Sequence, residues 1–140
     1  MAINWSDPKS KVTPNFTVKD ACWLPSWGKL HKPTTQEQAN LLQMCQLMEK
    51  IRVFLGNKEI VVHCMIRPSE YNKQIGGSPR SAHLEGLACD FSVKGMDCDD
   101  VRKLLLPKLE GWKCRMEDLP DSNWVHVDLK AVITQRFFKP

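Results

Sequence analysis

The sequence has no apolar run long enough to cross a membrane. A spanning helix needs about 20 predominantly apolar residues, and polar or charged residues interrupt every apolar segment of this 140-residue chain before that length is reached. Residues 1–7 also lack a basic start followed by an apolar stretch, which is the pattern of a secretory signal peptide. We therefore expect no membrane association, and a protein that is synthesised in the cytoplasm.

Cysteine pairs at metal-site or redox-site spacing are also lacking. The six cysteines, at positions 22, 45, 64, 89, 98 and 114, include no pair separated by two residues. Without an export signal, scattered cysteines are more typical of reduced, buried thiols than of disulfides or a second metal site. Cys64 alternates with Val62 and Ile66, which predicts that its thiol faces the core.

Strong charge of one sign is missing as well. The net charge of +4 is modest, so we expect a mostly solvated surface and no nucleic-acid partner. Internal repeats and low-complexity segments are absent, and the length suits one domain with a real core. We expect that domain to be a monomer.

The apolar pattern predicts helices and strands after an irregular start. Residues 1–14 are polar and contain two prolines, so we expect an irregular arm ahead of a single domain over residues 15–140. Apolar residues recur at helical spacing from about 35 to 55, after Thr34 and before Gly56. Further helical segments are expected at 69–75 and 98–107, and strands at 60–65, 87–93, 112–117 and 123–129. This order predicts an α+β fold, with a mainly antiparallel sheet and helices packed on one side.

Two polar clusters carry the chemistry of the sequence. His83 and Asp90 are seven positions apart, a spacing that suits a loop which turns at Gly86 and then enters a strand. About thirty-five residues later, residues 124–128 alternate, so that His126 and Asp128 share one strand face and two valines share the other. One face of that strand is therefore polar and the other belongs to the core.

The polar clusters predict a zinc site. Two histidines and one carboxylate from separate strands are a usual way to hold a catalytic zinc ion, with the fourth position open. We expect His83, Asp90 and His126 to be the ligands, and Asp128 to orient an imidazole N–H rather than to be a fourth ligand. The alternative is that these side chains form a hydrogen-bonded network without metal.

Ser81, His83, Gly86, Ala88 and Asp90 stand at a fixed spacing and are followed by the Trp-Val-His-Val-Asp segment at 124–128. In this pattern the chain resembles the M15 zinc D-alanyl-D-alanine peptidases. Three further segments agree: Asn-Phe-Thr-Val at 15–18, the Ile-Arg at 51–52 that ends a helix, and Ile-Arg-Pro-Ser-Glu-Tyr-Asn at 66–72. The resemblance covers about residues 15–132.

The resemblance implies a hedgehog-like or D,D-peptidase-like fold, a Zn²⁺ cofactor and a peptidase site. It makes Arg67 the cation that binds a substrate carboxylate or steadies the oxyanion, although a surface ion pair is the alternative. Ser81 either contacts substrate or a ligand, or simply caps a turn.

The sequence departs from the family at the general base. Many relatives carry an acidic residue three places before the last zinc histidine, where this chain has Asn123. An amide cannot accept a proton, so another carboxylate has to serve. If Glu117 pairs with Trp124 across a hairpin, Glu117 lies on the His126 face and within reach. Asp118 and Asp121 in the connecting loop are the alternatives, and Glu117 would then be a solvated hairpin residue.

Two functions remain open at this stage. The first is a zinc metallopeptidase that cleaves an amide of the peptidoglycan stem peptide or cross-bridge, as a D,D-carboxypeptidase or an endopeptidase. Such a protein would be a phage-type endolysin or virion-associated wall enzyme, acting on the cell wall after release from the host cytoplasm or from the virion. The second is a zinc-stabilised binding or structural module without hydrolytic activity, which Asn123 favours.

Overall fold

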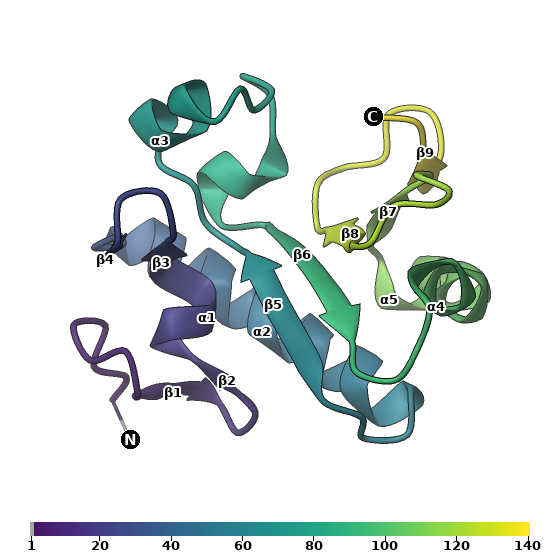
Figure 1. Ribbon diagram of the computed structural model, residues 1–140, viewed down its shortest axis with the longest axis horizontal. Coiled ribbons are helices and arrows are strands. Elements are labelled where there is room, and N and C mark those ends of the chain that lie inside the picture. Colours follow the sequence, from purple (N-terminus) through teal and green to yellow (C-terminus); the bar gives the residue numbers. More distant parts are fainter. Residues whose placement is uncertain (1) are drawn as a thin grey trace.

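A five-stranded sheet forms the centre of the protein (Figure 1). The computed structural model describes residues 2–140. The strands lie in the order β5 (Ile60–Cys64), β6 (Ala88–Val93), β8 (Val125–Asp128), β7 (Arg115–Glu117) and β9 (Phe137–Phe138). Neighbouring strands run antiparallel, except β7 and β9, which are parallel. The sheet confirms the prediction of a mainly antiparallel α+β fold.

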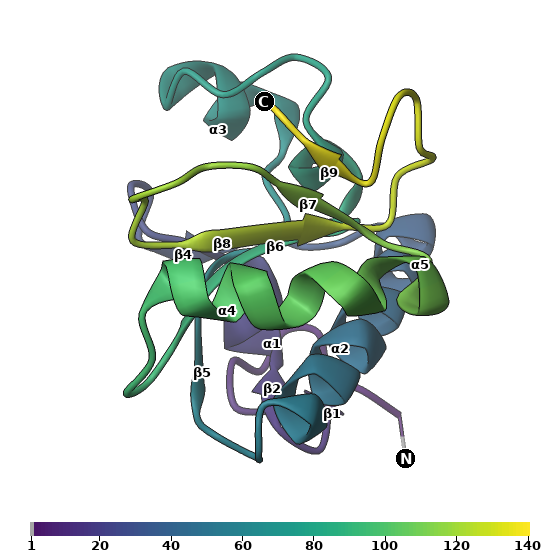
Figure 2. The same cartoon turned by 90° about the vertical axis from the view of Figure 1, so that its right-hand side faces the viewer.

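Most helical residues cover one face of this sheet. Figure 2 shows α1, α2 and α4 on one side of β6 and β8, and α3 on the other. The helical elements are α1 (Val18–Cys22), α2 (Thr35–Phe54), α3 (Ser69–Gln74), η1 (Ala82–Glu85), α4 (Cys98–Leu105), η2 (Leu106–Lys108) and α5 (Leu109–Trp112). None of the helices within residues 2–140 combines the length and the apolar character that crossing a membrane requires.

The core lies between the sheet and α2. Cys89 and Phe91 of β6 are buried against it, as are Val125 and Val127 of β8. Since side chains alternate along a strand, the residues between them face away from the core. This alternation leaves Asp90 and His126 on the opposite face of the sheet.

Local signals fix both ends of α2. Thr34 and Glu37 form a capping box, in which each side chain accepts a hydrogen bond from the other residue's backbone N–H. After the helix, Gly56 has a φ of 81°, a left-handed conformation that glycine adopts without strain. The predicted start and end of this helix are confirmed.

The N-terminal segment is more regular than predicted. Strand β1 (Lys11–Thr13) pairs with β2 (Phe16–Thr17), and Val12 is buried in the core. Asn15, in the turn between them, donates hydrogen bonds from its backbone and side chain to the Glu49 carboxylate, at 2.8 and 2.7 Å. The expectation that residues 1–14 are irregular is therefore wrong for residues 11–13, because one apolar side chain and a tethered turn suffice for a short strand. A second hairpin joins β3 (Trp23–Leu24) and β4 (Lys29–Leu30).

Cys64 also departs from its prediction. A bulge in β5 between Val62 and Cys64 changes the side-chain alternation, and Cys64 then pairs with Asp90. Paired residues share a face of the sheet, so the thiol lies on the polar face and is only half-buried. The other five cysteines are buried, and all six are free thiols within residues 2–140.

Candidate active site

Two adjacent central strands place Asp90 and His126 side by side. Asp90 of β6 is the register partner of His126 of β8, so both side chains leave the same face of the sheet. The imidazole Nδ1 of His126 lies 2.8 Å from Asp90 Oδ1. Antiparallel pairing therefore brings together two residues that are 36 positions apart.

A short 3₁₀ turn adds His83 to this pair. Ser81 caps the turn by accepting a hydrogen bond from the His83 backbone N–H, and Gly86 ends it with a φ of 74°. A side chain at Gly86 would press against Leu41 of α2, with a Cβ 3.1 Å from Leu41 Cγ. The turn is thus seated directly on the core. The Nδ1 of His83 lies 2.6 Å from the Met65 carbonyl oxygen, which leaves Nε2 to face Asp90.

The three side chains fit a metal site. One ligand atom from each of His83, Asp90 and His126 lies within 4.8 Å of the others. His83 Nε2 is buried and has no hydrogen-bond partner within residues 2–140, although Asp90 Oδ1 is 3.2 Å away. An unpartnered buried nitrogen that faces a carboxylate suits a metal ligand better than a satisfied hydrogen-bonded network. The two nitrogens and one oxygen are ligand atoms that zinc prefers.

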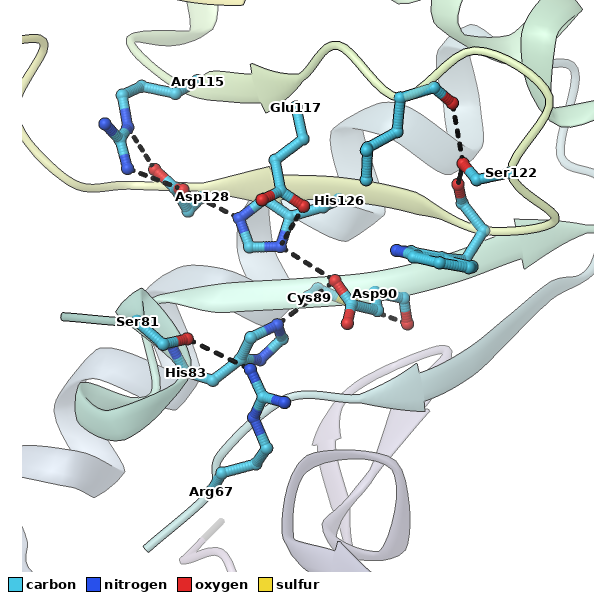
Figure 3. A network of polar contacts seen from close by, with 12 residues as sticks. Arg67, Ser81, His83, Cys89, Asp90, Arg115, Glu117, Ser122, His126 and Asp128 are labelled. Carbon is cyan, nitrogen blue, oxygen red and sulfur yellow. Dashed lines mark hydrogen bonds and ion pairs between the residues drawn. The ribbon is translucent and has the colours of Figure 1, made fainter. Parts of the chain in front are cut away.

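Asp128 contacts His126, and Arg115 contacts Asp128 (Figure 3). Asp128 Oδ2 lies 2.8 Å from His126 Nε2, the ring nitrogen that faces away from Asp90. Arg115 donates two hydrogen bonds to the Asp128 carboxylate, at 2.8 and 3.0 Å. The buried Asp128 thus lies within hydrogen-bond distance of the imidazole that it is predicted to orient.

The carboxylates shift the pKa of both imidazoles. Burial opposes the charged form of both imidazoles, but hydrogen bonds to carboxylates outweigh it: Asp90 raises the pKa of His83, and Asp128 followed by Asp90 raises the pKa of His126. Burial would raise the pKa of Asp90, yet the two imidazoles lower it well below its usual range. The centre therefore combines a firmly ionised carboxylate with two imidazoles whose positive form it favours, which is an electrostatic setting that suits a bound cation.

Glu117 faces this centre from the neighbouring strand. Arg115 pairs with Asp128 and Met116 with Val127, so continuation of this register places Glu117 opposite His126. The expected pairing of Glu117 with Trp124 is wrong, but the two registers differ by two residues and keep Glu117 on the same face. Glu117 Oε1 lies 3.6 Å from His126 Nδ1. Burial raises the pKa of Glu117, which favours a group that must accept a proton and pass it on.

The alternative bases lie elsewhere. Asp118 forms an ion pair with Lys139, at 3.2 Å. Asp121 and Asn123 line a different hollow beside the start of α4, where the Asp121 backbone N–H donates to Asp99. Of the carboxylates considered for the base, Glu117 is the one that this geometry brings to His126.

Arg67 and Ser81 lie next to His83. The Arg67 backbone N–H donates to the His83 carbonyl oxygen at 2.9 Å, and its guanidinium donates to Ser81 Oγ at 3.1 Å. Arg67 Nε is buried and has no hydrogen-bond partner within residues 2–140. A guanidinium that lines the pocket and keeps an unpaired donor fits recognition of an anionic group better than a surface ion pair.

These side chains share one pocket of about 400 Å³. The two histidines and the carboxylates line it together with cationic and aromatic side chains. The lining residues that matter here are Arg67, Arg80, Glu117, Trp124, His126 and Phe138.

An α+β fold with a His-Asp-His group and a carboxylate in one pocket is the arrangement of a metallopeptidase. Residues 16–128 match the family model described as Peptidase M15. The chain therefore belongs to the M15 peptidase family, whose members are typically zinc-dependent. Neither the curated proteins nor the solved structures gave a match.

Sequence reasoning missed several residues of the pocket, among them Arg80, Arg115 and Phe138. Arg115 belongs to no motif. Because it alternates with Glu117 on one strand, it could have been predicted to lie on the same sheet face as His126. Phe138 belongs to a two-residue strand, which is too short for a periodic pattern to reveal.

Proposed function

We propose that this protein is a zinc-dependent peptidoglycan peptidase. His83, Asp90 and His126 would hold the ion, and the substrate would be an amide bond of the stem peptide or the cross-bridge. The observation that carries the proposal is the position of Glu117: a carboxylate within 3.6 Å of a candidate ligand, in the same pocket, in a chain of the M15 family.

The residues of the pocket have separate roles in hydrolysis. When bound, zinc supplies a Lewis acid that polarises the scissile carbonyl and acidifies a water molecule. Glu117 accepts the proton of the attacking water and delivers it to the leaving nitrogen. Arg67, oriented by Ser81, donates to the oxygen of the scissile carbonyl as negative charge develops there, or binds a substrate carboxylate.

Asp128 keeps His126 in position during this chemistry. Its carboxylate accepts the N–H of the imidazole nitrogen that faces away from Asp90, and this contact fixes both the tautomer and the ring orientation. Arg115 keeps Asp128 ionised and in place through two hydrogen bonds.

The substrate class is supported by the family and by the cations of the pocket. Arg67 and Arg80 line it, and peptidoglycan stem peptides carry carboxylates. We further propose that the protein is a phage-type endolysin or virion-associated enzyme, which reaches the wall after release from the cell in which it is made.

Dye release from purified cell walls tests this function. We expect release by the zinc-loaded protein, loss of release with a chelator, and recovery when zinc is restored. Mass spectrometry of the digested muropeptides then identifies the bond that is cut. A zinc-loaded, folded protein that releases no dye and no muropeptide from any wall tested would favour the binding module instead. Asn123 was the feature that favoured the binding module. Glu117 weakens that argument, because it supplies a carboxylate beside His126 on the same face of the sheet.

A further inference from the structure

The last twelve residues build part of the pocket although they lie outside the family match. The match ends at residue 128, but Phe138, Lys139 and Pro140 line the same pocket as the candidate metal ligands. This wall is therefore a feature of the present chain rather than of the matched region.

Pairing with β7 sets the direction of Phe138. Strand β9 runs parallel to β7, with Glu117 and Phe138 as register partners. The Asp118 backbone N–H donates to the Phe138 carbonyl oxygen at 2.6 Å, and the Met116 N–H donates to Arg136 at 2.7 Å. Register partners present their side chains on the same face, so the Phe138 ring stands beside Glu117. Figure 2 shows β9 next to β7, above the plane of β8.

Contacts on two sides hold the Phe138 ring in place. The Arg115 guanidinium carbon lies over the ring, 4.1 Å from its centroid, and Arg115 is itself fixed by Asp128. The ring also meets His126 edge-on, with centroids 6.3 Å apart and an interplanar angle of 84°. Phe138 is therefore a positioned wall of the pocket.

We propose that Phe138 determines which substrate residue fits on the leaving-group side of the scissile bond. The proposal rests on the peptidase function given above. Because Glu117 must deliver a proton to the leaving nitrogen, the residue that carries this nitrogen lies on the Glu117 side of the pocket. Phe138 is the next side chain along that face, and its ring limits this residue to a small side chain such as that of alanine.

A pair of stem-peptide analogues tests the proposal. The probes are L-Lys-D-Ala-D-Ala and L-Lys-D-Ala-D-Leu, which differ only in the size of the last side chain. Turnover is measured on the zinc-loaded protein with and without Phe138→Ala. Binding is measured by calorimetry on the zinc-loaded Glu117→Gln protein, again with and without Phe138→Ala. The matched control is Phe54→Ala, which removes a ring that meets Trp112 edge-on at the C-terminal end of α2.

We expect the unmodified pocket to prefer D-Ala, and Phe138→Ala to reduce that preference at least about tenfold, since single methylenes in apolar pockets are worth roughly 10–200-fold. Zinc content should not change, and Phe54→Ala should keep the original preference. Phe138→Leu, which retains apolar packing on Arg115, should have an intermediate effect and covers the case in which Phe138→Ala fails to fold.

The outcomes separate this proposal from the proposed function. An unchanged D-Ala to D-Leu ratio in both Phe138 variants overturns the role of Phe138, even if the protein hydrolyses cell walls. If the protein hydrolyses neither probe nor cell walls, but the Phe138 variants lose the preference for D-Ala in the binding experiment, the role of Phe138 stands and the proposed peptidase function is wrong. Failure of the zinc-loaded protein to bind either probe overturns the role of Phe138.

Discussion

The candidate metal ligands and the candidate base share one pocket, but different parts of the fold hold them. The metal half of the site consists of His83 on the η1 turn and of Asp90 and His126 on the adjacent strands β6 and β8. The edge half consists of Arg115 and Glu117 on β7 and of Phe138 on β9, the two-residue strand at the edge of the sheet.

This difference suggests a division of labour. The metal half is anchored in the core, because the residues that alternate with its ligands are buried beneath α2 and α4. The edge half depends on the short strand β9, which supplies the last hydrogen bonds of β7. We expect changes in the metal half to remove the cofactor, and changes in the edge half to alter catalysis and selectivity while the cofactor stays.

The largest effect is expected from the loss of both imidazoles. In the double variant His83→Ala/His126→Ala, elemental analysis should find almost no zinc, against about one ion per chain in the parent protein. Hydrolysis should be lost with it, because one carboxylate cannot hold the ion. The control is His63→Ala, which removes an exposed histidine that contacts Ser92 on β6. Equal zinc content in the parent and the double variant would contradict the assignment of the metal half.

Removal of the proposed base should come next. Glu117→Gln keeps the size of the side chain but cannot accept a proton, so activity should fall by about 10²–10⁴-fold. Zinc content and thermal stability should stay as they are, which the same elemental analysis and a melting curve measure.

Asp118→Asn is the matched control for Glu117→Gln. It makes the same chemical change at the next residue, whose carboxylate faces Lys139 instead of the metal half, and it should cost little activity. The assignment fails if Asp118→Asn is inactive while Glu117→Gln is not.

Arg67 should have a smaller effect than the base. Arg67→Lys preserves the charge but loses the planar fork, so we expect activity to fall by about 10²–10³-fold, the range found when one oxyanion donor is removed. Zinc content should not change, and Arg52→Lys on α2 should behave as the parent does. Full activity of Arg67→Lys in cell-wall assays would return Arg67 to the role of a surface residue.

What the sequence could predict follows the same division between the two halves. The alternation along 124–128 predicted that His126 lies on the sheet face that points away from the core. The turn at Gly86 predicted that His83 and Asp90 come close together. Both signals are local in the sequence. The antiparallel sheet and the ends of α2 were predictable for the same reason.

The edge half depends on pairings that no local pattern reveals. The register of β7 on β8 was predicted two residues away from the observed one, since the long connection at 118–124 does not fix it. Glu117 was still assigned to the correct face of the sheet, because a register shift of two residues preserves the alternation of side chains. Strand β9 and the bulge before Cys64 were missed, because they arise from pairing with strands that are distant in sequence.

The smallest effect should come from Asp128, which touches both halves. Asp128→Asn retains an oxygen for the His126 N–H but loses the charge that Arg115 binds. Replacing such partners of a ligating histidine typically weakens metal binding by about 10–100-fold. We expect that loss in a competition titration with a chromophoric chelator, and nearly full activity once zinc is in excess. A variant that binds zinc as the parent does, yet stays slow at saturating zinc, would place Asp128 with Glu117 in catalysis rather than behind His126.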